Sequence, residues 1–234
     1  YPANMQALVT GAARRIGRAI ALALGGAGYR VAVHYNRSRR EAEETAALLG
    51  GAPLVQGDQA RDPERIVAEA AAALGGLDLL VCSAAQFEKV SSEELRRARF
   101  EAMLAANLTG PFYLMQAALP FLRTARGSIV NLVDVCGTAQ VWKGYAHYAA
   151  SKAGLAALTR LLALEWAPEV RVNAVAPGAA LLDDPADPER LVKRIPLQRI
   201  GTAEDVARAV LFLAREPFIT GQILTVDGGR SLKP

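Results

Sequence analysis

Two residues that could transfer a proton stand four positions apart in this sequence. Tyr148 and Lys152 lie in the run GYAHYAASKAGLAAL, and Asp134 precedes Tyr148 by fourteen residues. If the segment from about residue 145 is helical, both side chains leave the same helix face. An ammonium near a phenol favours the phenolate, so such a pair could exchange a proton near neutral pH. The spacing therefore predicts a proton-transfer site, with an ordinary amphipathic helix as the alternative.

Short apolar segments alternate with helical patterns along the chain, and these elements must position the pair. Strands are expected at 5–10, 30–34, 54–58, 77–83, 128–134, 170–176 and 222–227. Helices are expected at 14–27, 39–49, 63–74, 91–105, 107–122, from about 145, and at 203–214. This alternation is typical of parallel strands joined by right-handed crossovers. We expect one Rossmann-type α/β domain over 1–234, a doubly wound seven-stranded parallel sheet with helices on both faces.

The longest irregular stretch runs over 178–200, where Pro and Asp are frequent. Long irregular segments in compact domains are often lids or binding loops. We therefore expect 178–200 to be a substrate loop.

Composition narrows the classes of protein and of partner. The 234 residues are 52% hydrophobic, enough for one large core, yet no apolar run approaches the ~18–20 residues of a membrane span. With no basic-then-apolar leader, we expect a cytoplasmic enzyme without a membrane partner. The net charge is +4, but basic residues are spread along the chain, so we expect no nucleic-acid partner. Cys82 and Cys136 lack metal-ligand spacing and are expected in the core, without a metal.

A candidate phosphate site follows the first expected strand. Gly11 and Gly17 bracket the strand-to-helix turn in TGAARRIG. Free backbone N–H groups and the helix dipole at such a turn can bind a pyrophosphate. A turn with glycine for packing would look the same, but its place at the first crossover favours a dinucleotide site.

Charge around the second expected strand predicts the cofactor. That strand runs into HYNRSRR (34–40), with no acid before Glu41, whereas a site for NAD usually has an acid there. It offers His34, Arg37 and Ser38, and Arg15 lies in the phosphate turn. Guanidinium groups bind phosphates well, so a 2′-phosphate and hence NADPH are predicted, with a solvated basic patch as the alternative.

Together these residues resemble the short-chain dehydrogenase/reductase superfamily over essentially the full chain. The resemblance rests on TGAARRIG, Asp58, Asn107, Tyr148 with Lys152, Pro177-Gly178 and the closing VDGG (226–229). It implies that Tyr148 donates a proton, Lys152 lowers the tyrosine pKa and binds the nicotinamide ribose, and Asn107 helps to hold a relay water. The cofactor contacts that it implies are Gly11, Arg15, Ile16, Gly17, His34, Tyr35, Asn36, Arg37, Ser38, Asp58, Ser83, Ala84, Lys152, Pro177 and Gly178.

Within that superfamily the chain is most similar to the pteridine reductases. Arg15 stands at the usual middle glycine, HYNRS matches a segment that grips the 2′-phosphate, Asp134 stands at the expected catalytic serine, and Phe87 matches a pterin-stacking phenylalanine. The resemblance implies NADPH-dependent reduction of a pterin-like molecule bound by Phe87, Asp134, Tyr148 and Arg14, in a homotetramer. Arg14 is expected either at the pocket mouth or near the phosphates. Departures are CSAA (82–85) for an NNAG-like segment, one extra residue between Asp134 and Tyr148, and a shorter loop after Gly178.

Asp134 bears most on the choice of substrate. A carboxylate near Tyr148 favours the neutral phenol, and an ionised carboxylate can only accept hydrogen bonds. A protonated Asp134, or one relaying from water, could supply a proton to a ring nitrogen, which suits C=N reduction. A local capping role for Asp134 is the alternative. Two other functions stay open: a reductase of 3-oxoacyl thioesters or other ketones, and a non-catalytic NADP-binding regulator.

Overall fold

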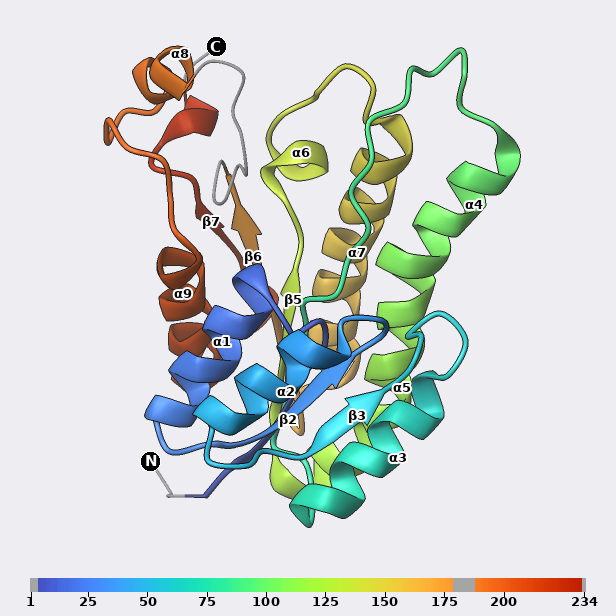
Figure 1. The fold of residues 1–234 in the computed structure, drawn as a ribbon, viewed down its shortest axis with the longest axis vertical. Helices are drawn as coiled ribbons and strands as arrows, with labels where there is room; N and C mark the ends of the chain where they lie inside the picture. The colour runs from blue at the N-terminus through green and yellow to red at the C-terminus, as the bar shows by residue number, and fades with distance from the viewer. Residues whose placement is uncertain (1–3, 179–187, 233–234) are drawn as a thin grey trace.

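A computed structural model describes residues 4–178 and 188–232, and their helices and strands alternate as the sequence predicts (Figure 1). The strands are β1 (Gln6–Val9), β2 (Arg30–Tyr35), β3 (Leu54–Gln56), β4 (Leu79–Cys82), β5 (Ser128–Leu132), β6 (Arg171–Pro177) and β7 (Ile223–Val226). The helices of the first half are α1 (Arg15–Gly26), α2 (Arg39–Leu48), α3 (Pro63–Leu74), α4 (Arg97–Leu104), a π-helical turn η1 (Ala105–Thr109) and α5 (Gly110–Ala125). Those of the second half are α6 (Val135–Thr138), α7 (Ala146–Glu165), α8 (Pro188–Lys193), α9 (Ala203–Arg215) and a 3-10 turn η2 (Arg230–Leu232).

One parallel sheet of seven strands runs through the described residues. Its order is β3-β2-β1-β4-β5-β6-β7, which confirms the predicted Rossmann-type fold. The chain builds outward from β1 to β3 and then returns to place β4 on the other side of β1. Ligands bind at the carboxyl edge beside such a switch point. The topology therefore places the candidate site beyond the ends of β1, β4 and β5.

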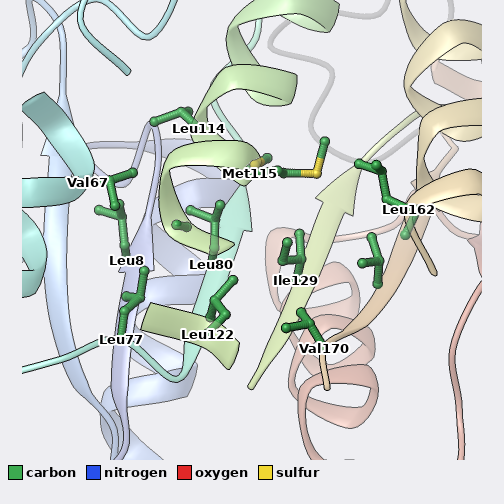
Figure 2. Close-up of a cluster of buried hydrophobic side chains, with 14 of the residues drawn as sticks. Leu8, Val67, Leu77, Leu80, Leu114, Met115, Leu122, Ile129, Leu162 and Val170 are labelled. Carbon is green, nitrogen blue, oxygen red and sulfur yellow. The ribbon is translucent and has the colours of Figure 1, made fainter. Parts of the chain in front are cut away.

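Helices cover both faces of the sheet and bury two hydrophobic clusters. One cluster joins α3, α5 and α7 to the sheet, and Figure 2 shows its leucines and valines packed with Met115. The other joins α1, α2 and α9 to the opposite face. Strands such as LLVC in β4 are buried throughout, because helices exclude water from both of their faces. This packing makes the sheet a rigid base for its carboxyl edge.

The structure corrects the expected helix boundaries on one side of the site. The helix predicted at 91–105 begins only at Arg97, and it does not end before the next helix at 107–122. Instead α4, η1 and α5 follow each other without a break, through a π-helical turn that contains Asn107. At Gly110 a Cβ would lie 2.9 Å from the carbonyl oxygen of Gln59, so glycine lets this turn approach the loop after β3. Turns of this kind are frequent at functional sites.

The predicted substrate loop 178–200 is only partly described. Its residues 179–187 lie outside the described residues, and its later part forms α8 and a segment that packs on the C-terminal turn. In the described part of the chain, no helix combines the length and apolar character needed to cross a membrane.

Candidate active site

Tyr148, Lys152 and Asp134 meet at the end of β5. Asp134 caps the N-terminus of α6, and its Oδ1 accepts a 2.7 Å hydrogen bond from the backbone N–H of Cys136. The Tyr148 hydroxyl donates a 2.9 Å hydrogen bond to the other carboxylate oxygen, Oδ2. Lys152 Nζ donates to the Leu132 carbonyl at 2.7 Å and lies 5.8 Å from the centre of the Tyr148 ring. Thus three residues chosen from their spacing share one buried site.

The close packing of α6 on α7 brings Asp134 to Tyr148. Gly137 in α6 has φ +98°, and a Cβ there would lie 2.5 Å from the Ala149 carbonyl oxygen in α7. Because only glycine fits this contact without strain, the sequence VCGT lets the turn after β5 lie against the first turn of α7. The contact holds the carboxylate opposite the phenol.

Burial and Asp134 set the charge state of the phenol. Burial, followed by the nearby carboxylate and its hydrogen bond, raises the pKa of Tyr148. The sequence-based expectation that a carboxylate near Tyr148 favours the neutral phenol agrees with this shift, whereas the expected effect of Lys152 on the phenolate stays a prediction. Burial also lowers the pKa of Lys152 to about 8, although Asp134 opposes that shift. Burial raises the pKa of Asp134, against the hydrogen bonds from Cys136 and Tyr148. Tyr148 is thus a neutral donor at physiological pH.

Asn107 holds the loop that follows β4. Its Oδ1 accepts a 2.8 Å hydrogen bond from the Gln86 backbone N–H, and its Nδ2 donates to the Gln86 carbonyl at 2.9 Å. Nδ2 also lies 3.3 Å from the Ser151 hydroxyl oxygen, which itself donates to the Tyr148 carbonyl. Asn107 therefore ties the loop to the helix that carries Tyr148. Its expected role in holding a relay water stays a prediction.

Phe87 is on the loop that follows β4 and lies beside Tyr148 of α7. Its ring stacks on Tyr145 at 4.9 Å and meets Tyr148 edge-on at 4.8 Å, and 57% of the residue is exposed. Trp142 extends the group, with its ring 5.8 Å from that of Tyr145. We call Phe87, Trp142, Tyr145 and Tyr148 the aromatic wall. The wall gives a flat or apolar substrate a surface next to the proton donor.

Sequence reasoning missed two groups that support this loop. Glu88 lies 3.9 Å from Nε2 of the fully buried His147 and 3.7 Å from Arg99. The Val90 backbone N–H donates to the Gly144 carbonyl at 2.8 Å. Nothing in their spacing marks these residues, because the loop and α7 are distant in sequence. Together with Asn107 they fix the position of Phe87.

The phosphate turn has the backbone that its glycines predict. Gly11 has φ +65°, and a Cβ there would lie 2.9 Å from the Ala84 Cα atom. A Cβ at Gly17 would collide with the Gly11 carbonyl oxygen, so the helix starts directly against the turn. Arg15 has φ +56°, a left-handed conformation that favours glycine. The predicted middle-glycine position therefore retains a glycine-like backbone under an exposed arginine.

Neighbouring residues of the turn have separate surroundings. Arg14 is exposed and precedes α1 in an extended conformation, while Ile16 packs partly against the core. The backbone N–H groups of Ser83 and Ala84 both donate to the Thr10 hydroxyl, at 2.9 and 3.0 Å. Those two N–H groups are therefore used within the protein, and the turn after β4 is joined to the end of β1.

His34 lies beneath the turn, and its ring does not reach the surface. Its Nδ1 accepts from the Gly11 backbone N–H at 3.3 Å, and its Nε2 lies 3.1 Å from the Gly57 carbonyl oxygen, to which it donates. Burial lowers the pKa of His34 to about 4, so the ring is neutral at pH 7. The predicted cofactor contact of His34 is therefore wrong for its side chain, which is buried within the protein. It joins the phosphate turn to the loop after β3.

Stability should fall in acid because of His34. Its pKa is about 4 in the folded protein and about 6.5 in the unfolded chain, so the unfolded chain binds more protons between these values. The contribution is complete above pH 6.5 and is lost as the pH falls through 4. From pH 7.5 to pH 5 we expect a loss of about 2 kcal/mol in the free energy of unfolding. Urea unfolding of wild type and His34→Gln at both pH values measures it, and an equal loss in both proteins would contradict it.

The other predicted cofactor residues cluster at the ends of β2, β3 and β6. Tyr35 is 5% exposed and packs in the core. Its predicted cofactor contact is therefore wrong for the ring. Asn36 and Arg37 are exposed, and Ser38 precedes α2. Asp58 accepts a 3.0 Å hydrogen bond from the Ala60 N–H. Gln56 at the end of β3 donates to the Asn36 carbonyl at 3.3 Å, so the end of β3 lies beside the exposed segment that contains Arg37.

Pro177 and Gly178 end β6 against the C-terminal turn. Pro177 pairs with Val226 in the sheet, and the Gly178 N–H donates to the Val226 carbonyl at 2.9 Å. A Cβ at Gly178 would collide with Asp227, so glycine allows this contact.

Cys82 and Cys136 are both buried, as the sequence predicts. Among the described residues, no group of three His, Cys, Asp or Glu side chains could hold a metal.

Arg230 is a further charged residue at this site that sequence reasoning did not select. Its guanidinium carbon lies 5.6 Å from the centre of the Trp142 ring. It follows VDGG directly, so its place after that motif was the available signal. Because Arg230 is far from Trp142 and Tyr148 along the chain, the sequence alone did not show that it lies beside Trp142.

Comparison with known proteins extends this picture over nearly the full chain. Residues 11–231 match the family described as Enoyl-(Acyl carrier protein) reductase. The chain is 39% identical over 241 residues to a Streptomyces violaceoruber protein named ketoacyl reductase 2 of the granaticin polyketide synthase, covering 97% of this chain and 96% of that protein. It is 36% identical over 246 residues to a 3-oxoacyl-(acyl-carrier-protein) reductase of Staphylococcus epidermidis, covering 97% and 98%.

Solved structures agree in fold. A short-chain dehydrogenase/reductase of Brucella melitensis, named glucose/ribitol dehydrogenase, superposes with a TM-score of 0.92 at 32% identity, covering 97% of each chain. The names of the two relatives above concern ketoacyl groups rather than pterins. The expected likeness to pteridine reductases in particular therefore has no support among these relatives.

Proposed function

Because the chain belongs to the short-chain dehydrogenase/reductase superfamily, we propose that it is an NADPH-dependent reductase whose proton donor is Tyr148. The first candidate substrate is a ketone such as a 3-oxoacyl thioester, as the names of its relatives suggest. The observation that carries the proposal is the neutral Tyr148 phenol, held by Asp134 and placed one turn from Lys152. In this proposal 1–234 act as one cofactor-binding domain with 178–200 as its substrate loop.

In this proposal, Tyr148, Lys152 and Asn107 each have a separate role in the reduction. Bound NADPH would supply hydride to the substrate carbon. Tyr148 donates its proton to the developing oxyanion or to a ring nitrogen. Its raised pKa keeps the phenol protonated at neutral pH but makes it a weaker acid, a cost that loss of the neighbouring carboxylate would reduce. Lys152 lies close enough to stabilise the phenolate that remains. Asn107 keeps the substrate-facing loop in position through Gln86.

The backbone of the phosphate turn fits a dinucleotide. Gly11 and Gly17 let the turn pack directly between the start of α1 and the loop after β4. A pyrophosphate could then bind at the N-terminus of α1, where backbone N–H groups and the helix dipole favour an anion. Asn36 and Arg37 are exposed at the end of β2, where the 2′ position of the adenosine ribose would lie. This arrangement supports NADPH over NADH, and Arg37 and Arg15 are the proposed phosphate ligands.

Arg37→Ala should weaken NADPH binding selectively. Losing a charge-assisted contact to the 2′-phosphate should raise the Kd for NADPH about tenfold or more and change that for NADH less than about twofold. Fluorescence titration of each reduced cofactor measures both constants. Arg39→Ala is the matched control, since Arg39 is paired with Glu43 at 2.8 Å. Equal weakening of NADPH and NADH would remove Arg37 from the 2′-phosphate site.

Reduction of a pterin-like C=N bond is the second candidate. One observation favours it: a carboxyl group, Asp134, lies beside the proton donor, and burial raises its pKa. A carboxyl that can be protonated suits a ring nitrogen better than a ketone oxygen. Phe87 would then stack on the ring. The comparisons favour the ketone, and the side chain at position 134 favours the pterin.

Oxidation of NADPH with two substrates tests the proposal. Purified protein is supplied with an acetoacetyl thioester or with dihydrobiopterin, and absorbance at the NADPH band is followed. We expect turnover of the thioester with a kcat/KM at least about tenfold above that of dihydrobiopterin. Preference for dihydrobiopterin would establish the second candidate. Failure of both, with a broad ketone panel, would favour a non-catalytic NADP-binding regulator.

We further propose a cytoplasmic homotetramer. Apolar side chains remain exposed on α7 and near β7, including Leu164 at 78% and Phe218 at 102%. Large exposed apolar side chains on two surfaces are compatible with two kinds of subunit contact. Light scattering coupled to gel filtration tests this proposal, and a monomer at micromolar concentration would contradict it.

A further inference from the structure

The side chain of Arg230 lies over one end of the aromatic wall. Its guanidinium carbon is 5.6 Å from the centre of the Trp142 ring. Gln140 joins the two residues: its Nε2 donates to the Arg230 carbonyl at 3.3 Å, and its Oε1 accepts from Trp142 Nε1 at 3.3 Å. These contacts connect segments 90 residues apart. They fix a cation beside Trp142.

A tight turn after β7 holds Arg230 in place. The Asp227 carboxylate accepts hydrogen bonds from the Gly229 and Ser231 backbone N–H groups, at 2.8 and 2.7 Å. The same turn packs on Gly178 at the end of β6. The hydrogen bonds from the Gly229 and Ser231 backbone to the Asp227 carboxylate fix the turn. This turn places Arg230 at the carboxyl edge of the sheet. The position of the guanidinium is therefore built into the fold.

Within the described residues, the charges around Arg230 are poorly balanced. Among the described residues, no carboxylate lies within 4 Å of the guanidinium of Arg230 or of Arg194. Burial and the neighbouring Arg194 lower the pKa of Arg230, while Asp134 and Asp227 oppose that shift. Both carboxylates are already hydrogen-bonded, Asp134 to Tyr148 and Cys136 and Asp227 to its turn. The partly exposed Arg230 and its exposed neighbour Arg194 would therefore both be stabilised by an added anion.

The aromatic wall connects this cationic end to the reacting end. Successive ring centres are 5.8 Å apart for Trp142 and Tyr145, 4.9 Å for Tyr145 and Phe87, and 4.8 Å for Phe87 and Tyr148. A substrate lying along these rings would have its reducible bond at Tyr148. Its far end would then reach Trp142 and Arg230.

We propose that Arg230, assisted by Arg194, binds an anionic group on the far end of the substrate. The group is a carboxylate or a phosphate, which a guanidinium can bind through two N–H groups. This inference rests on the proposed reductase function and names a substrate class for it: a ketone, or a pterin-like ring, that carries a carboxylate or phosphate remote from the reduced bond. Arg230 is thus a specificity-determining residue.

Paired substrates test the site. A series of linear oxocarboxylates with increasing distance between ketone and carboxylate is compared with the corresponding methyl esters. We expect at least one acid to exceed its ester about tenfold in kcat/KM at low ionic strength. Arg230→Gln should abolish that preference mainly through KM, and Arg230→Lys should restore part of it. Dihydrofolate against dihydrobiopterin gives the same comparison for the pterin candidate, and a phosphate-bearing ketone against its dephosphorylated form covers the other anion.

A charge-matched control and a binding measurement complete the design. Arg126→Gln removes an equal charge just before β5, at the opposite edge of the sheet, and should leave the preference unchanged. Titration of the NADP⁺ complex with the same acids should change the fluorescence of Trp142, and Trp142→Phe identifies that signal. Equal losses for acid and ester in Arg230→Gln would mean that Arg230 acts through Asp134, and would overturn the proposal.

The binding measurement also separates failure of this inference from failure of the proposed function. If no ketone or pterin is reduced, the reductase proposal fails. Acid-specific quenching of Trp142 that Arg230→Gln removes would then still support the anion site. Turnover without any acid preference, and without quenching, would overturn the anion site alone.

Discussion

Tyr148→Phe is expected to lower kcat by about 10³-fold while the Kd for NADPH changes less than about twofold. Among the described residues, the phenol is the only hydroxyl that donates to the Asp134 carboxylate, and positioned acid catalysis contributes about 10²–10⁴-fold. The ring itself stays, so its contacts with Phe87 and Tyr145 persist. Steady-state oxidation of NADPH with the preferred substrate gives kcat, and fluorescence titration gives the Kd.

Tyr145→Phe provides the matched control for that loss. Tyr145 lies in the same aromatic wall and stacks on Phe87, but no described hydrogen bond uses its hydroxyl. We expect less than a threefold change in kcat for Tyr145→Phe. A similar collapse in both variants would show that the hydroxyl of Tyr148 is not the proton donor. A Tyr148→Phe enzyme with nearly full activity would transfer that role to Asp134.

Asp134→Ser should change which substrate is reduced. A serine hydroxyl can donate to a ketone oxygen, and loss of the carboxylate removes one of the causes that raise the pKa of Tyr148. We expect ketone reduction to rise about tenfold and dihydropterin reduction to fall about tenfold. The ratio of the two kcat/KM values should therefore shift about 100-fold toward the ketone.

Asp134→Asn separates charge from capping in this experiment. An asparagine can still accept the Cys136 N–H, so the start of α6 is kept. We expect thermal stability and NADPH affinity close to those of wild type, with the carboxyl chemistry lost. If Asp134→Ser and Asp134→Asn both leave the substrate ratio unchanged, Asp134 only caps the helix. Weaker NADPH binding in both would place Asp134 at the cofactor instead.

Local patterns in the sequence predicted the elements that carry the site. Buried strands and amphipathic helices have different periods, so apolar runs such as LLVC and the turn TGAARRIG were readable without coordinates. The helix boundary near Asn107 was not readable, because a continuous π-helical turn depends on the contact between Gly110 and Gln59. Local sequence patterns thus predicted the type and order of the helices and strands better than the boundaries between them.

The sequence by itself determined the fold class and placed Tyr148 and Lys152 on one helix face, because a four-residue helical spacing is a local fact. That Asp134 meets them depends on the close contact between Gly137 and Ala149, which belongs to the tertiary structure. Only the tertiary structure decided the state and surroundings of those groups. Burial and Asp134 raise the pKa of Tyr148, His34 is sealed beneath the phosphate turn, and Arg230 reaches Trp142 from the far end of the chain. Desolvation and contacts between distant segments arise from packing, so spacing along the chain does not reveal them.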